Sequence, residues 1–526
     1  MKHLSLLLGL ATLVSVGSSV RAQGTPTGLP LANASEPAAA QAATEYSRAR
    51  LDQDLAAIQM FRPEYPFWRY IFTIPDGRIA FGSAQDGRLL AIFPNAGDWA
   101  RDGVWEEQGL NELLNGRTLP RDLDARRDEV VRLLTPVTGP LVHNPTRGEF
   151  LTPNARRYGG FLQEWGKIYE RFGVPAEIGL AQAILESGLD GRARSRARAV
   201  GFCQFLSSNW AFLNKLSPAV LEAYNQTTQA PYCAAYLTIL ATMYGSYIPA
   251  LSEHHAGGVN VGRTVINGER LGGVGSREQY FLGSDFAGRL REISAERYSD
   301  LFRTYGYKSS LYAEMVFGNM VNVKRLTAEY QQSAIFAMRL STARPAVDIT
   351  ARSGLKLDVV KRFNPALGKR VPAHANLYLP IYVKAFGPDV SFWHRPPTPQ
   401  YAAVLNDFLH VESGIERWHE ASFETTLRAF QNRFEATRTE EGSVMATTLA
   451  YVISDLRTSR RAAILEEFRT SGRILDLFKQ GVDELGVTIR GTVAAGPSQP
   501  PEESRQPAEE SRQPPEESRQ PPEERR

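Results

Sequence analysis

The sequence predicts a mainly helical protein, α+β overall, that is divided into several domains. With 526 residues, the chain is too long for one ordinary hydrophobic core. Apolar residues recur at three- and four-residue spacing over residues 161–185, and residues 404–487 are again amphipathic, which is typical of helices packed on a core. Short apolar runs between turn residues near 70–93 and 335–381 predict two small β-containing units.

Residues 1–22 are predicted to be a secretory signal peptide, and residues 23–45 to be a linker. The chain starts with a basic residue, Lys2, and residues 4–16 form an apolar run that is short for a membrane span. Small residues precede the expected cleavage site after Ala22. An N-terminal anchor helix is the alternative. We expect no transmembrane segment after cleavage, and an exported protein of the periplasm or cell envelope.

Residues 46–149 are expected to form an N-terminal module to which we assign no role. A turn at Pro75-Asp76-Gly77 predicts a hairpin within it. The predicted elements are a short helix, the two hairpin strands and a third strand, over residues 46–60, 70–74, 79–82 and 89–93.

Residues 150–325 have the pattern of a helical domain. One helix is predicted to end at Gly173, and Pro175 is suited to the start of the next. Further helices are expected near residues 231–247 and 311–323.

The C-terminal third is predicted to contain a βααβ unit, a helical region and a tail, over residues 333–384, 400–490 and 491–526. The βααβ prediction rests on two strand-like runs and one helix, over residues 335–340, 377–381 and 357–363. The tail repeats Pro-Pro-Glu-Glu-Ser-Arg-Gln, which has no large apolar residue, so it is expected to be disordered or polyproline-like.

Charge and cysteine content exclude some classes of function. Lys and Arg total 60 against 57 Asp and Glu, and a net charge of +3 gives no argument for nucleic-acid binding. The two cysteines, Cys203 and Cys233, have no histidines near them at metal-ligand spacing, so they do not make a zinc site. No metal or organic cofactor is expected. In an exported protein such a pair favours a disulfide, and two buried free thiols are the alternative.

The stretch that points to chemistry is Ala181-Gln182-Ala183-Ile184-Leu185-Glu186-Ser187-Gly188. An apolar helix runs directly into Glu186, and Gly188 suits the helix end. Burial there disfavours the carboxylate and raises its pKa. A carboxyl group that stays protonated suits the cleavage of a glycosidic bond, because the leaving oxygen must receive a proton. An ordinary surface glutamate at a helix end is the alternative.

Three further blocks follow this stretch. They are Ala199-Val200-Gly201-Phe202-Cys203-Gln204-Phe205-Leu206, Glu253-His254-His255-Ala256-Gly257-Gly258 and Arg277-Glu278-Gln279-Tyr280-Phe281. In this order and at these intervals, the four blocks resemble the soluble lytic transglycosylase family, and more narrowly its branch of membrane-bound lytic murein transglycosylase D. The resemblance covers residues 150–325 and implies a lysozyme-like helical catalytic domain.

The resemblance also implies roles for single residues. Glu186 matches the catalytic acid, and Tyr280 matches the tyrosine that lies against that acid. The other residues implied to line the saccharide groove or to bind near the sugar are Ser187, Gly201, Gln204, Ala256 and Gly257.

The chain departs from the family pattern at two places. His254-His255 stand where a Tyr-Asn pair is usual, and Phe202-Cys203 stand where Leu-Met is usual. An imidazole still donates a hydrogen bond to a sugar or to its N-acetyl group, so both histidines are included among the substrate-binding candidates. Exposed loop polarity is the alternative for both.

The reaction implied by the resemblance uses one carboxyl group, whereas standard glycosidases use two. Glu186 would protonate the glycosidic oxygen between N-acetylmuramic acid and N-acetylglucosamine in peptidoglycan glycan strands. The same group would then take the proton of the muramoyl C6 hydroxyl, which closes onto C1 and leaves a 1,6-anhydromuramoyl end without consuming water. Asp190 is interpreted as a loop-capping residue and not as a second catalytic carboxylate.

The βααβ unit resembles a LysM glycan-binding module in its second half, residues 359–367 and 377–380. Its first half departs from that family, since Ala343-Arg344-Pro345 stands where Gly-Asp-Thr is usual. A degenerate packing module is the alternative.

Three other functions stay open at this point. A hydrolytic muramidase of the goose-lysozyme type would use a second carboxylate and consume water. A non-catalytic wall-binding protein would bind peptidoglycan without cleaving it, its activity lost through the change at His254-His255. A structural envelope protein would depend on its flanking domains and tail.

Overall fold

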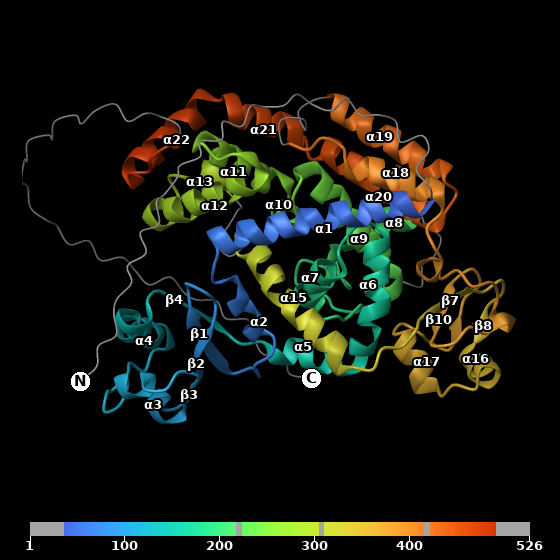
Figure 1. Ribbon diagram of the computed structural model, residues 1–526, viewed down its shortest axis with the longest axis horizontal. Coiled ribbons are helices and arrows are strands. Elements are labelled where there is room, and N and C mark those ends of the chain that lie inside the picture. The colour runs from blue at the N-terminus through green and yellow to red at the C-terminus, as the bar shows by residue number, and fades with distance from the viewer. Residues whose placement is uncertain (1–35, 217–223, 304–309, 415–420, 491–526) are drawn as a thin grey trace, which may run out of the picture.

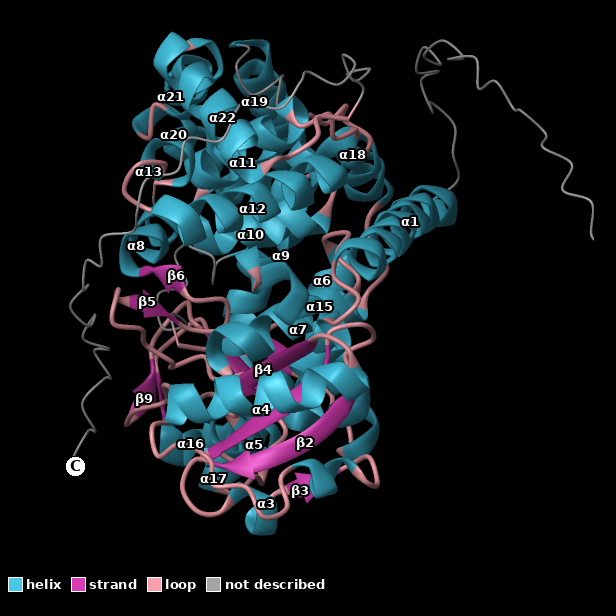
Figure 2. Ribbon diagram, turned by 90° about the vertical axis from the view of Figure 1, so that its left-hand side faces the viewer, coloured by secondary structure: helices cyan, strands magenta, loops and turns pink. Residues whose placement is uncertain are grey.

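A computed structural model of the chain describes residues 36–216, 224–303, 310–414 and 421–490, so the predicted signal peptide and repeat tail lie outside the described residues. The described chain is mainly helical with a few small sheets, which confirms the predicted fold class. Within these ranges, no helix combines the length and the hydropathy needed to cross a bilayer. Figures 1 and 2 both place the C-terminal helices at one end of the molecule and the two β-containing units at the other.

A central helical domain, residues 148–329, lies between these ends. Its helices are α5 (Gly148–Tyr158), α6 (Leu162–Arg171), α7 (Ala176–Ser187), α8 (Ser207–Leu216), α9 (Gln226–Tyr244), α10 (Tyr247–Ala256), α11 (Gly258–Arg270), α12 (Gly275–Ser294), α13 (Ser299–Phe302) and α15 (Tyr312–Glu329). The chain leaves α6 through Gly173, which has a φ of +75°, and α7 begins after Pro175, as predicted. Helices α7 and α9 are buried on nearly every side, as their continuously apolar sequences require.

The C-terminal region is helical, as predicted, and packs back onto the central domain. Its helices are α18 (Pro399–Leu409), α19 (Ala421–Ala436), α20 (Glu440–Thr458), α21 (Arg461–Thr470) and α22 (Gly472–Leu485). Helix α20 contacts α8 and α9, and α21 contacts α11. The C-terminal helices therefore support the central domain from one side, as Figure 1 shows.

Helix α1 (Glu36–Phe61) corrects two expectations from the sequence. It includes residues 36–45, which were expected to be a linker, and it lies along α18 instead of within the N-terminal module. The alanines near its start have the highest helix propensity of any residue. Leu51 and Ile58 are fully buried in the main core, so packing against distant helices stabilises this helix.

The N-terminal β-containing unit is an antiparallel sheet with the strand order β3-β2-β1-β4. Its strands are β1 (Arg78–Ser83), β2 (Leu89–Pro94), β3 (Val104–Trp105) and β4 (Leu141–Pro145), accompanied by helices α3 (Trp99–Asp102) and α4 (Leu123–Thr138). Val130 and Leu134 of α4 join the sheet in a core of its own.

The predicted hairpin of this unit is wrong in its first strand. The hairpin joins β1 and β2 through residues 84–88, and the preceding apolar run starts with helix α2 (Trp68–Ile71). Trp68, Ile71 and Phe72 are buried in the main core at helical spacing, and α2 packs on α15. A short apolar run can be a strand or a buried helix by its local pattern. Packing against the central domain therefore decides that this run starts as a helix.

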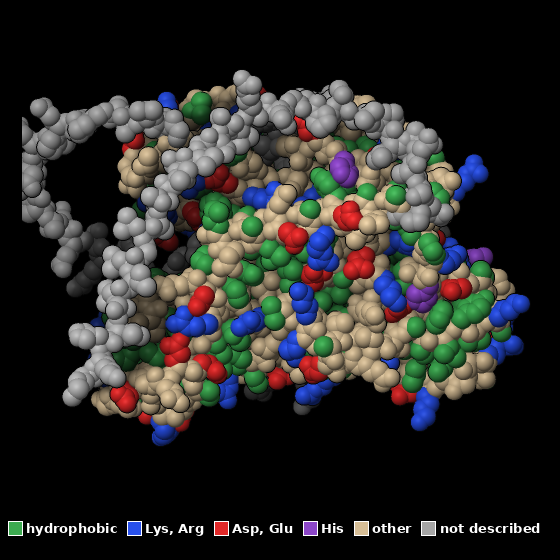
Figure 3. Space-filling model, in the orientation of Figure 1, with side chains coloured by type: hydrophobic (Ala, Val, Ile, Leu, Met, Phe, Trp, Pro, Cys, Tyr) green, Lys and Arg blue, Asp and Glu red, His purple; other side chains and the backbone are tan. Residues whose placement is uncertain are grey.

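The βααβ order predicted for residues 333–384 is confirmed. Its elements are β7 (Phe336–Arg339), α16 (Ala346–Ser353), α17 (Leu357–Phe363) and β10 (Asn376–Leu379), with a second, minor pair of strands, β8 (Arg344–Pro345) and β9 (Arg370–Val371). Met338, Ile349, Val360 and Leu377 form part of its separate core. On the face shown in Figure 3, apolar side chains gather over this unit.

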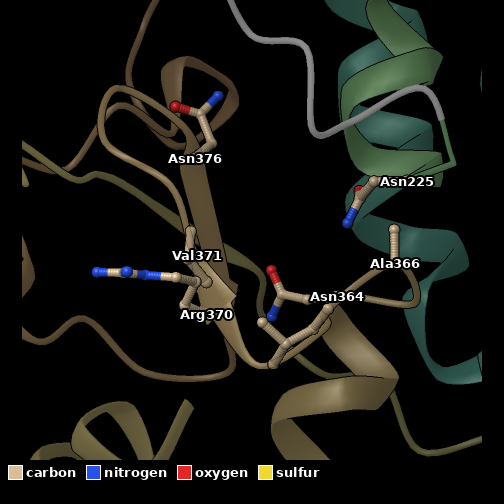
Figure 4. A pocket seen from close by; sticks show the side chains of 7 residues that line it. Asn225, Asn364, Ala366, Arg370, Val371 and Asn376 are labelled. Atoms are coloured by element: carbon tan, nitrogen blue, oxygen red, sulfur yellow. The ribbon is translucent and has the colours of Figure 1, made fainter. Parts of the chain in front are cut away.

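A small pocket lies at the seam between the βααβ unit and α9 (Figure 4). Its amide side chains bind neighbouring backbone. Asn225 donates to the Phe363 carbonyl at 3.0 Å, and Asn364 donates to the Tyr378 carbonyl at 2.6 Å. Asn225 thus ties the unit to the central domain, and Asn364 ties two segments within the unit.

A buried ion pair joins α21 to α10. The Arg461 guanidinium donates to both carboxylate oxygens of Glu253, at 2.6 and 2.7 Å, and the Tyr244 hydroxyl donates to Glu253 at 2.6 Å. Both charged side chains are almost completely buried, so each depends on the other for compensation.

Replacing Arg461 by Met is expected to lower the free energy of unfolding by about 3 to 5 kcal/mol, because the Glu253 charge is left buried without its partner. Urea denaturation measures the change. The control is Arg457→Met, which removes an exposed ion pair to Glu424 and should cost less than about 1 kcal/mol. Equal losses of unfolding free energy in the two variants would show that the buried ion pair contributes no more to stability than the exposed one.

Candidate active site

Glu186 stands in the last turn of α7, at the predicted helix end. Gly188 caps the helix with a φ of +57°, and a Cβ atom there would lie 2.2 Å from the Phe150 carbonyl oxygen. Only glycine therefore allows the chain to turn away at this point. The turn leaves the Glu186 side chain at the edge of the buried helix, with 13% of its surface exposed.

Burial and one phenol control the ionisation of Glu186. The Tyr312 hydroxyl donates to Oε1 of Glu186 at 2.5 Å. Burial raises the pKa of the Glu186 carboxyl to about 7, against the opposing effect of the Tyr312 hydrogen bond, which stabilises the carboxylate. A large fraction of the Glu186 carboxyl is therefore protonated at neutral pH, which is what a general acid requires.

Contrary to what the family resemblance implied, Tyr280 does not lie beside Glu186. Its hydroxyl lies 2.6 Å from the Ser252 hydroxyl and 3.3 Å from the Ser310 carbonyl oxygen, within the core. Tyr312, at the start of α15, is the tyrosine that binds Glu186. Nothing in the local sequence marks Tyr312, because its contact with Glu186 spans 126 residues.

The Gly-x-x-Gln block forms the turn between two short strands, β5 (Ala199–Val200) and β6 (Phe205–Leu206). Gly201 has a φ of +86°, and a Cβ atom there would lie 2.3 Å from the Gln229 side chain. Gln229, fully buried, accepts from the Phe202 amide at 2.6 Å, and sequence reasoning missed it. Gln204 donates to the carbonyls of Ala193 and Gly201, at 3.0 Å each, so it shapes the loop from within.

Ser187 ties the same loop to α7. Its hydroxyl is buried and lies 3.0 Å from the carbonyl oxygens of both Ala183 and Phe202. The expected contact between Ser187 and the sugar is therefore corrected to a structural contact, which fixes the loop beside Glu186.

The predicted disulfide between Cys203 and Cys233 is confirmed, with 6.0 Å between the two Cα atoms. It connects the Gly-x-x-Gln loop to α9. Both cysteines are buried, so the loop is anchored in the core next to the candidate acid.

The two histidines occupy different environments in the last turn of α10. His254 is nearly buried, and its Nε2 lies 2.8 Å from the Cys203 carbonyl oxygen and 3.5 Å from Oε1 of Glu186. His255 is exposed and stacks on the Tyr312 ring, with the centroids 4.6 Å apart. Burial lowers the pKa of both imidazoles, that of His254 to about 4, so both are neutral at neutral pH. The structure therefore brings His254 to Glu186, and it brings His255 to Tyr312, which binds Glu186.

The residues after this pair form the turn into α11. Ala256 ends α10, and Gly257 is exposed with a φ of +83°. The Ala256 carbonyl accepts from the Asn260 side chain at 2.6 Å.

Asp190 is a loop cap, as predicted, because its carboxylate accepts from the Arg192 amide at 2.9 Å. Across the described ranges, no cluster of three or more His, Cys, Asp and Glu side chains is arranged to hold a metal ion. The site thus offers one protonated carboxyl group surrounded by neutral donors.

No protein-family model matches this chain, and no curated protein is significantly similar to it.

Replacing Tyr312 by Phe is expected to raise the pKa of Glu186 by roughly one unit, because the lost hydrogen bond stabilises the carboxylate. NMR titration of ¹³C-labelled glutamate measures this pKa, with the Glu186 signal assigned by its loss in Glu186→Gln. The matched control is Tyr280→Phe, which should leave the pKa unchanged. A shift in the control without one in Tyr312→Phe would reverse the assignment of the two tyrosines.

Reduction of the disulfide is expected to lower the free energy of unfolding by about 3 to 4 kcal/mol, the chain-entropy value for a loop of this length. Denaturation of the same protein with and without reductant measures the difference. Alkylation of the protein without reductant, followed by mass spectrometry, is the control, and labelling of both thiols would contradict the bond.

Proposed function

We propose that this protein is a lytic transglycosylase, which cleaves the β-1,4 bond between N-acetylmuramic acid and N-acetylglucosamine in peptidoglycan. The observation that carries the proposal is Glu186, a nearly buried carboxyl group whose pKa is raised to about 7 and which, among the described residues, has no Lys or Arg partner. The order of the four sequence blocks around it supports the same family. The proposal includes export to the cell envelope, where the substrate is found.

In the proposed reaction Glu186 gives its proton to the glycosidic oxygen, and the bond from that oxygen to C1 of the muramoyl residue breaks. The Glu186 carboxylate then takes the proton of the muramoyl C6 hydroxyl. The C6 oxygen bonds to C1 and closes the 1,6-anhydro ring. Glu186 regains its proton, and no water is consumed.

The charges around Glu186 favour this reaction over hydrolysis. An inverting or retaining hydrolase uses a second carboxylate as base or nucleophile. Asp190, the acidic residue closest in sequence, caps its own loop. Among the described residues, burial raises the pKa of Glu186 and the Tyr312 hydrogen bond opposes that rise, with no contribution from another carboxylate. One group acting first as acid and then as base fits this environment.

The βααβ unit is proposed to hold the glycan strand near the catalytic domain. Four of its apolar side chains are substantially exposed, as sugar-binding surfaces require: Val347, Leu357, Ile381 and Tyr382. This part of the proposal rests on the resemblance to LysM modules.

Replacing Glu186 by Gln is expected to reduce cleavage of purified sacculi by about a hundredfold or more, since the variant keeps the shape and loses the transferable proton. Release of soluble fragments measures the rate, and thermal unfolding checks that the variant folds. The control is Glu177→Gln in the first turn of the same helix, which removes an ion pair to Arg48 and should leave the rate nearly unchanged.

Mass spectrometry of the products separates the transglycosylase from a hydrolase. After borohydride treatment, an anhydro end is about 20 mass units lighter than a reduced hydrolytic end. Anhydro products are expected. Products with reducible muramoyl ends alone would establish the hydrolytic muramidase, and intact sacculi would favour a binding protein.

A further inference from the structure

His254 stands between two acceptors. It comes from the last turn of α10, and 7% of its side chain is exposed. Its Nε2 lies 2.8 Å from the Cys203 carbonyl oxygen, which is hydrogen-bonding distance, and 3.5 Å from Oε1 of Glu186, which is slightly longer. One ring nitrogen thus faces both the loop and the candidate acid.

The chemistry of these partners determines which nitrogen carries the proton. A backbone carbonyl only accepts hydrogen bonds, so Nε2 of His254 must be the N–H donor. Burial, together with the neighbouring His255, keeps this imidazole neutral by lowering its pKa to about 4. The ring is therefore a neutral donor next to a carboxyl group that must lose a proton and regain it.

We propose that His254 is a positioning residue for Glu186, whose Nε2–H moves from the Cys203 carbonyl to the Glu186 carboxylate when the acid has given up its proton. The inference rests on the proposed function, because it assigns His254 to the ionised stage of that reaction. A carboxylate is a stronger acceptor than a carbonyl, and the ring needs only a small movement to reach it.

A neutral donor suits this task better than a cation would. A cation at 3.5 Å would favour the carboxylate so strongly that Glu186 would lose its proton before substrate arrived. A neutral N–H stabilises the carboxylate more weakly, so the acid form persists at neutral pH. This balance gives a physical reason for a buried histidine at this position.

The surroundings hold the imidazole in place. The rings of Phe205 and Tyr236 lie 5.6 and 5.8 Å from it, and Cys203 is anchored to α9 by its disulfide. The charged group next to it in the chain, Glu253, is held by Arg461 on the other side of α10.

Tyr236, whose phenol pKa is raised by burial well above the ordinary value, faces the His254 ring, and the other titratable groups at this point are Tyr312 and His255. Tyr312 binds Glu186 directly, and burial raises the pKa of its phenol well above the ordinary value. His255 is exposed and stacks on Tyr312. Both are neutral at neutral pH, so Glu186 is the group that changes charge near pH 7.

The test compares variants that remove the donor with one that keeps it. His254→Phe fills the space between Phe205 and Tyr236, and His254→Ala empties it, but both lose the N–H. His254→Gln keeps an N–H donor. His410→Gln is the remote control, since His410 is exposed at the end of α18. Thermal unfolding selects the variants that fold.

Two readouts are measured on each folded variant: the pKa of Glu186 by ¹³C NMR, and the pH profile of sacculus cleavage. In the donor-free variants we expect the pKa and the alkaline limb of kcat/KM to rise by about one pH unit, because the carboxylate loses a partner. We expect kcat to fall about ten- to a hundredfold with little change in KM, and His254→Gln to recover part of it.

An unchanged Glu186 pKa in the donor-free variants would overturn the proposal, even if activity were lost, since a merely structural role moves stability and not the pKa. The NMR titration requires no turnover. If wild-type protein left sacculi intact, the proposed function would fail while the titration still decided the role of His254.

Discussion

A carboxyl group that is taken out of water must meet a cation or remain protonated, and the architecture of this protein depends on that constraint. Among the described residues, every buried Asp or Glu side chain lies beside a basic one: Asp54–Arg277, Glu164–Lys167, Glu253–Arg461, Glu314–Arg62 and Glu441–Arg171. Four of these pairs join segments far apart in the sequence. They fasten α1, α20 and α21 to the central domain, so these flanking helices are bound to it by charge as well as by apolar packing.

Glu186 differs from these paired groups, because no Lys or Arg side chain among the described residues pairs with it. Burial raises its pKa to about 7, as it also raises the pKa of Glu314 beside Arg62, but the neighbours of Glu186 are a phenol and a neutral imidazole and not a Lys or Arg side chain. The same desolvation cost that the ion pairs offset elsewhere in the protein is not offset by a Lys or Arg side chain at Glu186, which is why Glu186 is the candidate proton donor. Since α10 carries His254 on one side and Glu253 on the other, the buried pair with Arg461 also determines where the imidazole stands relative to the acid.

The loop beside Glu186 is assembled from several independent constraints. The disulfide to α9, the buried amide of Gln229 and the hydroxyl of Ser187 each hold a different atom of residues 201–203. Several residues that a family pattern would assign to substrate, Ser187 and Gln204 among them, are instead occupied with the backbone of this loop. Their importance in the pattern follows from the shape they impose around the acid.

The sequence alone predicts features such as helix ends, the order of elements and loop caps, because their causes lie within a few neighbouring residues. Periodicity and capping signals predict the helix end at Glu186, the glycine after it, the βααβ order and the loop cap at Asp190. The disulfide is predicted from two cysteines in a chain with an expected signal peptide. Three features could not be read this way. The helix at residues 68–71 and the extension of α1 depend on burial against distant segments. Tyr280 and Tyr312 both lie on helices with an apolar face, and which phenol reaches Glu186 depends on which helix packs on α7, a position that α15 takes. No pattern within one helix carries that information, because the contact joins residues 126 positions apart.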